Sequence, residues 1–168
     1  MKKQGFTLIE LMVVIVIMGI LAAVAVPKLF GMIAKSKASE VGPAAGEYVK
    51  LQDAYVAESG DYIGNWTAIG YSMPSETSAF KFADPYTYDD KNSAAVPTSK
   101  QLLWSAEAKA ALNDCTKGSK WGLFGISGSG NGLNWDTGIG LGSTAPVAGT
   151  LASQCQILTP QFDKLNRS

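Results

Sequence analysis

Glu10 is the residue whose position most needs a chemical explanation. It is the only charged side chain between residues 5 and 26, and nearly all of its neighbours in that stretch are apolar. An ionised carboxylate is costly in apolar surroundings unless it is matched by a partner. Glu10 therefore indicates that this stretch does more than anchor the chain in a membrane.

The other side chains that could carry chemistry are few. The sequence has no histidine, so the usual general base and the commonest metal ligand are missing. Cys115 and Cys155 are too few for a structural zinc site. The 14 basic and 14 acidic residues balance, which leaves no basic field for nucleic acid. We therefore expect no catalytic residues, no metal, no cofactor and no nucleic-acid partner.

The element that must position Glu10 is a long apolar run. Residues 11–26 contain no charged side chain. With residues 6–9 the run reaches about 20 residues, enough for a helix to cross a hydrocarbon core of roughly 30 Å. Lys2 and Lys3 precede it and are expected to stay cytoplasmic. The run is predicted to be a membrane segment.

Two simple interpretations of this segment compete. A cleaved secretory signal would use the small residues at 22–25 as its cleavage site, but the apolar run is long for such a signal. An uncleaved anchor is the other interpretation. Neither explains why Glu10 stands at the start of the run.

The N-terminus also carries a specific motif. A basic leader ending in Gly5 is followed by Phe6, by Glu10 and by the long apolar run. This arrangement resembles the prepilin motif of type IV pilins and their relatives. The resemblance implies that a prepilin peptidase cuts between Gly5 and Phe6, removes leader 1–5 and N-methylates Phe6. The apolar segment would stay on the mature protein.

The resemblance further implies a role for Glu10 in assembly, as the partner of the terminal amine of Phe6 in a neighbouring subunit. Proline lacks a backbone donor and clashes with the carbonyl four residues earlier, so Pro27 predicts a distorted helix after Ala23. In related filaments, helices unwind between a glycine and a proline at positions matching Gly19 and Pro27. A simple kink at Pro27 is the alternative.

The resemblance and the residue pattern together predict an α+β fold, in which a long N-terminal helix packs against a small antiparallel sheet. Residues 6–29 form the membrane or filament-core helix, residues 30–59 the amphipathic half of the same helix, and residues 60–168 the globular head. Gly42 and Pro43 are expected to bend the helix without ending it, and Gly60 to end it.

Within the head, alternation of side chains predicts most of the elements. Strands are expected at residues 80–82, 86–88 and 121–125, with a clear one at residues 133–141. Residues 128–132 would join the last two as a hairpin loop. A short helix is expected within residues 98–110, and a further strand at residues 154–159.

The resemblance implies a structural subunit of a type IV pilus, made in the inner membrane and displayed as an extracellular filament. Its partners would be copies of itself in a helical filament, the prepilin peptidase and the pilus assembly machinery. A pseudopilin of a type II secretion system is the alternative, and a membrane-anchored enzyme is a third. Adhesion, motility and DNA uptake all stay open as the role of the filament.

The resemblance also implies a disulfide between Cys115 and Cys155, because pilins often close their C-terminal region in this way. After export the head would lie where disulfides form and persist. Two free thiols, or links between subunits, are the alternatives.

Overall fold

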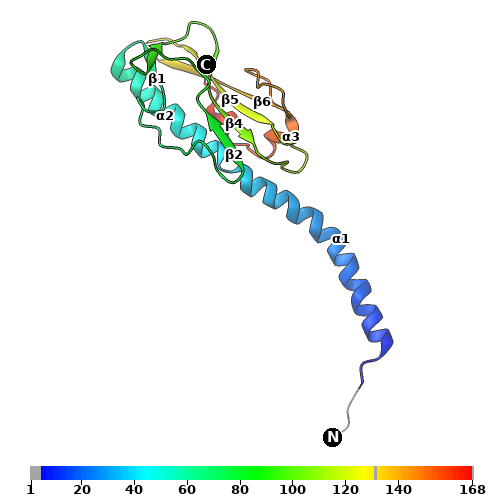
Figure 1. Cartoon of the computed structure of the whole chain (residues 1–168). Coiled ribbons are helices and arrows are strands. Elements are labelled where there is room, and N and C mark those ends of the chain that lie inside the picture. The colour runs from blue at the N-terminus through cyan, green and yellow to red at the C-terminus, as the bar shows by residue number, and fades with distance from the viewer. Residues whose placement is uncertain (1–4, 131, 168) are drawn as a thin grey trace. The chain divides into compact units, whose positions relative to one another are not determined.

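A computed structural model describes residues 5–130 and 132–167 of the chain. The chain divides into two compact units, Met1–Ile33 and Ala34–Ser168. Figure 1 labels most of the elements. The helices are α1 (Leu8–Ala38), α2 (Val41–Ser59), α3 (Ser153–Gln156) and the 3-10 helix η1 (Asp163–Leu165). The strands are β1 (Tyr62–Gly64), β2 (Phe80–Ala83), β3 (Ser93–Ala95), β4 (Gln101–Ala108), β5 (Lys120–Ser127) and β6 (Leu133–Gly140).

The first unit consists of most of α1 and the residues before it. The apolar run forms a helix that is long and apolar enough to cross a membrane, by length and composition. Its large apolar side chains are exposed within the single chain. Pro27 lies inside α1, and the helix continues on both sides of it. Unwinding between Gly19 and Pro27 stays a prediction.

The long N-terminal helix is present over Leu8–Ser59 as the sequence predicts, and a two-residue turn at Ser39 and Glu40, the helix break, interrupts it. These residues form a turn, so the amphipathic half predicted at residues 30–59 is divided between α1 and α2. Pro43 supplies the physical reason. It cannot donate a hydrogen bond to the carbonyl of Ser39, and its ring would crowd that carbonyl. Pro43 instead occupies the first turn of α2, where a missing donor is tolerated.

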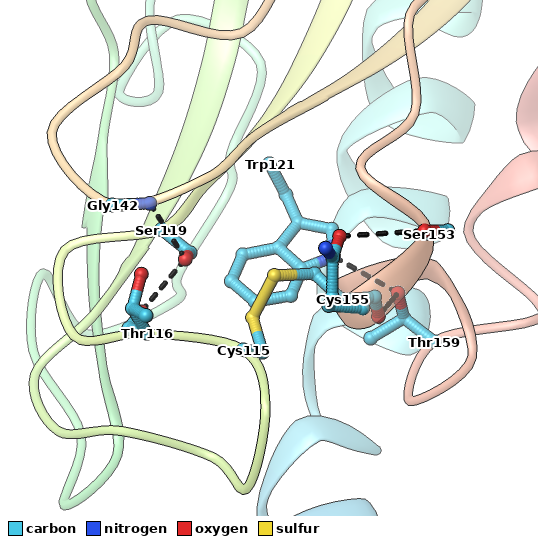
Figure 2. The surroundings of a disulfide bond; sticks show 9 residues. Cys115, Thr116, Ser119, Trp121, Gly142, Ser153, Cys155 and Thr159 are labelled. Carbon is cyan, nitrogen blue, oxygen red and sulfur yellow. Dashed lines mark hydrogen bonds between the residues drawn. A yellow bond between two sulfur atoms is a disulfide. The ribbon is translucent and has the colours of Figure 1, made fainter.

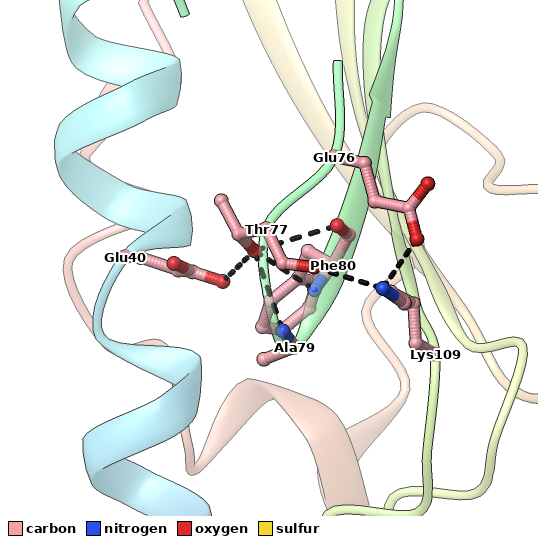
Figure 3. A network of polar contacts seen from close by, with 6 residues as sticks. All are labelled: Glu40, Glu76, Thr77, Ala79, Phe80 and Lys109. Atoms are coloured by element: carbon pink, nitrogen blue, oxygen red, sulfur yellow. Dashed lines mark hydrogen bonds and ion pairs between the residues drawn. The ribbon is translucent and has the colours of Figure 1, made fainter. Parts of the chain in front are cut away.

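Polar contacts with the head hold the helix break (Figure 3). The hydroxyl of Thr77 donates to Glu40 Oε1 over 2.7 Å, and Lys109 Nζ donates to the carbonyl of Thr77 over 2.9 Å. Lys109 also pairs with the carboxylate of Glu76. The side chain of Glu40 is therefore tied to the loop before β2 and, through it, to the end of β4.

The head contains a four-stranded antiparallel sheet of order β2-β4-β5-β6 and a two-stranded sheet formed by β1 and β3. Strand β5 pairs with β6 along its whole length, and Leu123 faces Thr137 in this register. Gly60 ends α2 with a φ of 88°. The α+β fold, the strand at 80–82 and the hairpin of β5 and β6 are as the sequence predicts.

The expected helix within residues 98–110 is wrong, because this segment forms β4. Its neighbours β2 and β5 both pair with it, and pairing from two sides outweighs the helical preference of its alanines. The side chains of Trp104, Ala106 and Ala108 alternate into the core. A register shift between Leu102 and Trp104 interrupts this alternation and hides the period of two residues in the sequence.

Two expected strands are also absent from the described residues. Residues 86–88 lie in a loop, where the hydroxyl of Tyr88 donates to Asp84 Oδ1 over 3.0 Å. Residues 154–159 form α3 and the turns after it, and the N–H of Gln156 bonds to the carbonyl of Ala152 over 2.9 Å. Local hydrogen bonds of this kind replace the sheet ladder in both segments.

The core lies between α2 and the sheet. The ring of Tyr48 is fully buried, and it makes edge-on contacts with Tyr71 and Trp135. The Tyr48 hydroxyl donates to the carbonyl of Leu103 over 3.1 Å. Gln52 is buried as well, and it exchanges two hydrogen bonds with the backbone of Gly64. These contacts fix α2 against both sheets.

Candidate functional site

Glu10 lies in the first turn of α1, and its carboxylate faces back toward Thr7. Oε2 accepts hydrogen bonds from the backbone N–H of Thr7 over 2.9 Å and from its hydroxyl over 2.7 Å. The N–H of Glu10 in turn donates to the hydroxyl oxygen of Thr7 over 3.3 Å. Within the described residues, Oε1 makes no hydrogen bond.

These contacts form a capping box, in which the residue before a helix and the third residue of the helix satisfy each other's backbone donors. The sequence interpretation gave Thr7 no role. The signal was present nevertheless, since Thr7 and Glu10 have the Thr-x-x-Glu spacing directly before an apolar run. Glu10 thus has a function inside its own chain.

The side chains around Glu10 are apolar, and they are exposed within the single chain. A shallow hollow beside its carboxylate is lined by Phe6, Ile9, Val13 and Val14. The side chain of Phe6 is 85% exposed, and the apolar side chains of α1 stay exposed along the first unit. An apolar surface of this extent marks a site that contacts a membrane or other protein chains.

The other predicted N-terminal positions are open. Gly5 and Phe6 precede α1, lie outside any helix or strand and are both exposed, so neither residue is held by a fold that would have to open. A Cβ placed on Gly19 would meet nothing within 4 Å. Packing inside the single chain therefore does not require glycine at position 19.

The predicted disulfide between Cys115 and Cys155 is present in the structure (Figure 2). Its Cα atoms lie 4.9 Å apart and its cysteines are 40 positions apart in the chain. Both cysteines are fully buried. The bond joins the loop between β4 and β5 to α3.

Buried polar contacts support the disulfide on both sides. Trp121 Nε1 donates to the hydroxyl of Thr159 over 2.9 Å, close to Cys155. On the other side, the hydroxyl of Ser119 donates to the carbonyl of Thr116 over 2.7 Å and accepts from the N–H of Gly142 over 2.9 Å. The bridge closes a segment that contains both β5 and β6.

Asp84 is the carboxylate of the head with the most perturbed surroundings. It is half-buried, and it accepts hydrogen bonds from Tyr88 and from the backbone N–H of Trp66. Burial raises the pKa of Asp84 to about 6, and these hydrogen bonds offset only part of that rise. No base, nucleophile or cation lies among these contacts, so they serve to hold the loop that contains Asp84.

Comparison with known proteins places the N-terminal motif in a named family of sequences. A family model described as the prokaryotic N-terminal methylation motif matches residues 1–26. The match covers Gly5, Phe6, Glu10 and the apolar run up to Val26.

Several known proteins are similar over longer stretches. A fimbrial protein of Neisseria meningitidis serogroup B is 31% identical over 136 residues, covering 81% of this chain and 73% of the relative. The type IV major pilin protein PilA of Myxococcus xanthus is 38% identical over 71 residues, 42% of this chain and 32% of that protein. The type IV major fimbrial protein FimA of Dichelobacter nodosus is 41% identical over 68 residues, 39% and 44% of the two chains.

Proposed function

The chain belongs to the type IV pilin family, and we propose that it polymerises into a pilus filament through the apolar surface of α1. The observation that carries this proposal is Glu10, placed at the start of an otherwise uncharged and exposed helix. The subunit is inserted in the inner membrane before assembly and then becomes part of the filament on the cell surface.

Processing is the first step of the proposed route. A prepilin peptidase cuts between Gly5 and Phe6 and the new terminal amine of Phe6 is methylated. The exposure of these residues outside any helix or strand supports access by the peptidase. Intact-mass analysis of purified filaments tests the step. We expect the mass of the chain from Phe6 onward plus one methyl group. A mature terminus near residue 26 would instead indicate an ordinary signal peptide.

Assembly is the second step. The cut creates a cation on Phe6 near the carboxylate of Glu10. In the filament, each Glu10 pairs with the amine of Phe6 from a neighbouring subunit, so that two charges enter the apolar core as a matched pair. Oε1 of Glu10 is suited to this partner, because the bonds to Thr7 occupy Oε2. The apolar hollow beside Glu10 offers contact area for the ring of the incoming Phe6.

A pilus is favoured over a secretion pseudopilus. The relatives reported above are named as fimbrial proteins and type IV pilins. The disulfide of the C-terminal region supports the same choice, in line with the resemblance to pilins. We assign the protein a structural role, with copies of itself, the peptidase and the assembly machinery as its partners.

A further inference from the structure

The head has an open groove where the helix breaks. The groove has a volume of about 350 Å³. One wall is formed by Lys35, Gly42 and Pro43, and the other by the C-terminal segment Pro160, Gln161 and Phe162. Its size suits one large side chain. Lys35 is exposed at this groove and takes part in none of the ion pairs between described residues.

The opposite end of α2 presents a protrusion of complementary character. Tyr62 directly follows the turn that ends α2, and its side chain is 49% exposed. Asp61, the residue before it, and Glu58, at the end of α2, are both exposed. We name residues 58–62 the acidic tip. It offers an aromatic ring flanked by negative charge, whereas the groove offers an apolar slot beside a positive charge.

The acidic tip is held in a defined conformation. The hydroxyl of Ser59 donates to the carbonyl of Tyr62 over 2.9 Å. The N–H of Val96 donates to the carbonyl of Asp61 over 2.8 Å, and Tyr62 pairs with Ala95 in the small sheet. A surface that is already ordered loses little conformational entropy on binding. Tyr62 is therefore better placed as an anchor than a side chain on a free loop.

The groove and the acidic tip cannot meet within one chain. Helix α2 lies between them, and its 19 residues span roughly 28 Å at about 1.5 Å each. Different patches that complement each other on identical subunits make a heterologous contact, which repeats from copy to copy and builds rings or helical filaments. Two complementary ends on one head are the arrangement that a filament subunit needs.

We propose that the acidic tip of one subunit docks in the groove of another copy of this chain, with the ring of Tyr62 seated between Pro43 and Pro160, which are both exposed at the groove. This head-to-head contact rests on the proposed function, since it forms between subunits of the filament. It is separate from the contacts of α1 and Glu10. In this contact Lys35 faces the carboxylates of the acidic tip. The opposite charges favour the pairing of groove with tip over the pairing of two grooves or two tips.

A cysteine pair tests the contact directly. Full-length protein carrying Glu58→Cys and Gln161→Cys, which keeps Tyr62 and Asp61, is assembled into filaments, oxidised and analysed without reduction. We expect a ladder of covalent multimers, because the two new thiols lie on facing subunits. The matched control carries Ala54→Cys with Gln161→Cys. Ala54 is exposed on α2 outside both patches, so this control should stay monomeric after the same treatment.

Charge reversal provides a second readout. Lys35→Glu and Asp61→Lys should each lower filament yield several-fold, and the double variant should recover most of it. Thermal unfolding of each variant shows whether the head itself is intact. Filaments of normal yield that give no ladder, together with charge variants that do not rescue one another, would overturn the contact. Failure of the unmodified protein to form filaments would count against the proposed function instead.

Discussion

The carboxylate of Glu10 accepts two hydrogen bonds from Thr7, and both of them use the same oxygen, Oε2. The residue proposed to join subunits is therefore also the residue that begins its own helix. The two functions are compatible, because Oε1 is left for a second partner. They are also separable by mutation, since a capping box needs a hydrogen-bond acceptor while charge pairing needs an anion.

Glu10→Gln separates the two functions of this side chain. Glutamine keeps the acceptor of the capping box but carries no charge. We expect Glu10→Gln and Glu10→Ala to insert into the membrane normally and to lose filament assembly alike, because both leave the Phe6 amine of a neighbour unpaired. Filament yield and the membrane fraction are measured together. Normal assembly of Glu10→Gln would show that capping, rather than charge, is what filaments require.

Thr7→Val tests the other half of the box. Valine has nearly the shape of threonine but has no hydroxyl to cap the helix, and a lost N-cap typically costs about 1 kcal/mol. We expect faster amide hydrogen exchange in the first turn of α1, measured on the full chain in detergent. Thr7→Ser retains the hydroxyl and should exchange like the unmodified protein. Equal protection in all three proteins would contradict the capping role.

Local sequence rules predicted the N-terminal half well, because a membrane helix is recognised by composition and length alone. They predicted a bend at Gly42 and Pro43, but not the turn at Ser39 and Glu40. The proline rule places a defect four residues before each proline, at Ala23 for Pro27 and at Ser39 for Pro43. Only the second became a break between two helices, where Glu40 bonds to Thr77. That contact joins residues distant in the chain, and no local pattern contains it.

In the head, strands of clear alternation were predicted and ambiguous ones were missed. The shared parity of Leu133, Trp135 and Ile139 predicted β6, and these side chains are buried as expected. Strand β4 was mistaken for a helix because its register shift breaks the alternation and because alanine favours helices. Its conformation is decided by β2 and β5, which pair with it from distant parts of the sequence.

Asp84 predicts how the stability of the head depends on pH. Burial raises its pKa in the folded state to about 6, above the value of about 3.9 expected in the unfolded chain. Folding therefore favours the protonated form, so the contribution of Asp84 is fully present below about pH 4 and is lost as the pH rises through 6. The loss should be absent in Asp84→Asn, which is always neutral.

Thermal unfolding of the full chain in detergent at about pH 3.5, 5 and 7.5 measures this effect, because these conditions lie below, between and above the two pKa values. Asp90→Asn is the matched control, because Asp90 is an exposed carboxylate in the same loop region. We expect Asp84→Asn alone to reduce the fall in stability between the lowest and highest pH. An unchanged slope in that variant would refute the assignment to Asp84.

Asp53 joins the C-terminus to the sheet and to α2. Its Oδ1 accepts from the buried Nε1 of Trp135 over 2.8 Å, and its Oδ2 accepts from Arg167 over 2.5 Å. Asp53→Ala leaves the Trp135 donor unpaired, which typically costs about 1–3 kcal/mol. Arg167→Ala removes a half-exposed ion pair, worth less than about 1 kcal/mol. In chemical unfolding, the free energy of unfolding should be lower for Asp53→Ala than for Arg167→Ala. The reverse order would contradict the role of the hydrogen bond from Trp135.

The disulfide predicts the stability of the last third of the head. Closing a segment of 40 positions should stabilise the folded state by about 4 kcal/mol through loss of chain entropy in the unfolded state. Cys115→Ser is therefore expected to lower the stability of the head and to expose residues 116–154 to protease. Filament assembly through Glu10 should survive wherever the head still folds, since the bridge lies in the other unit.

The double variant Cys115→Ser with Cys155→Ser controls for a single reactive thiol and should be destabilised to the same extent. Thiol labelling of the unreduced, denatured protein checks the bond itself. Label on both cysteines of the unmodified protein would show that the bridge does not form in solution.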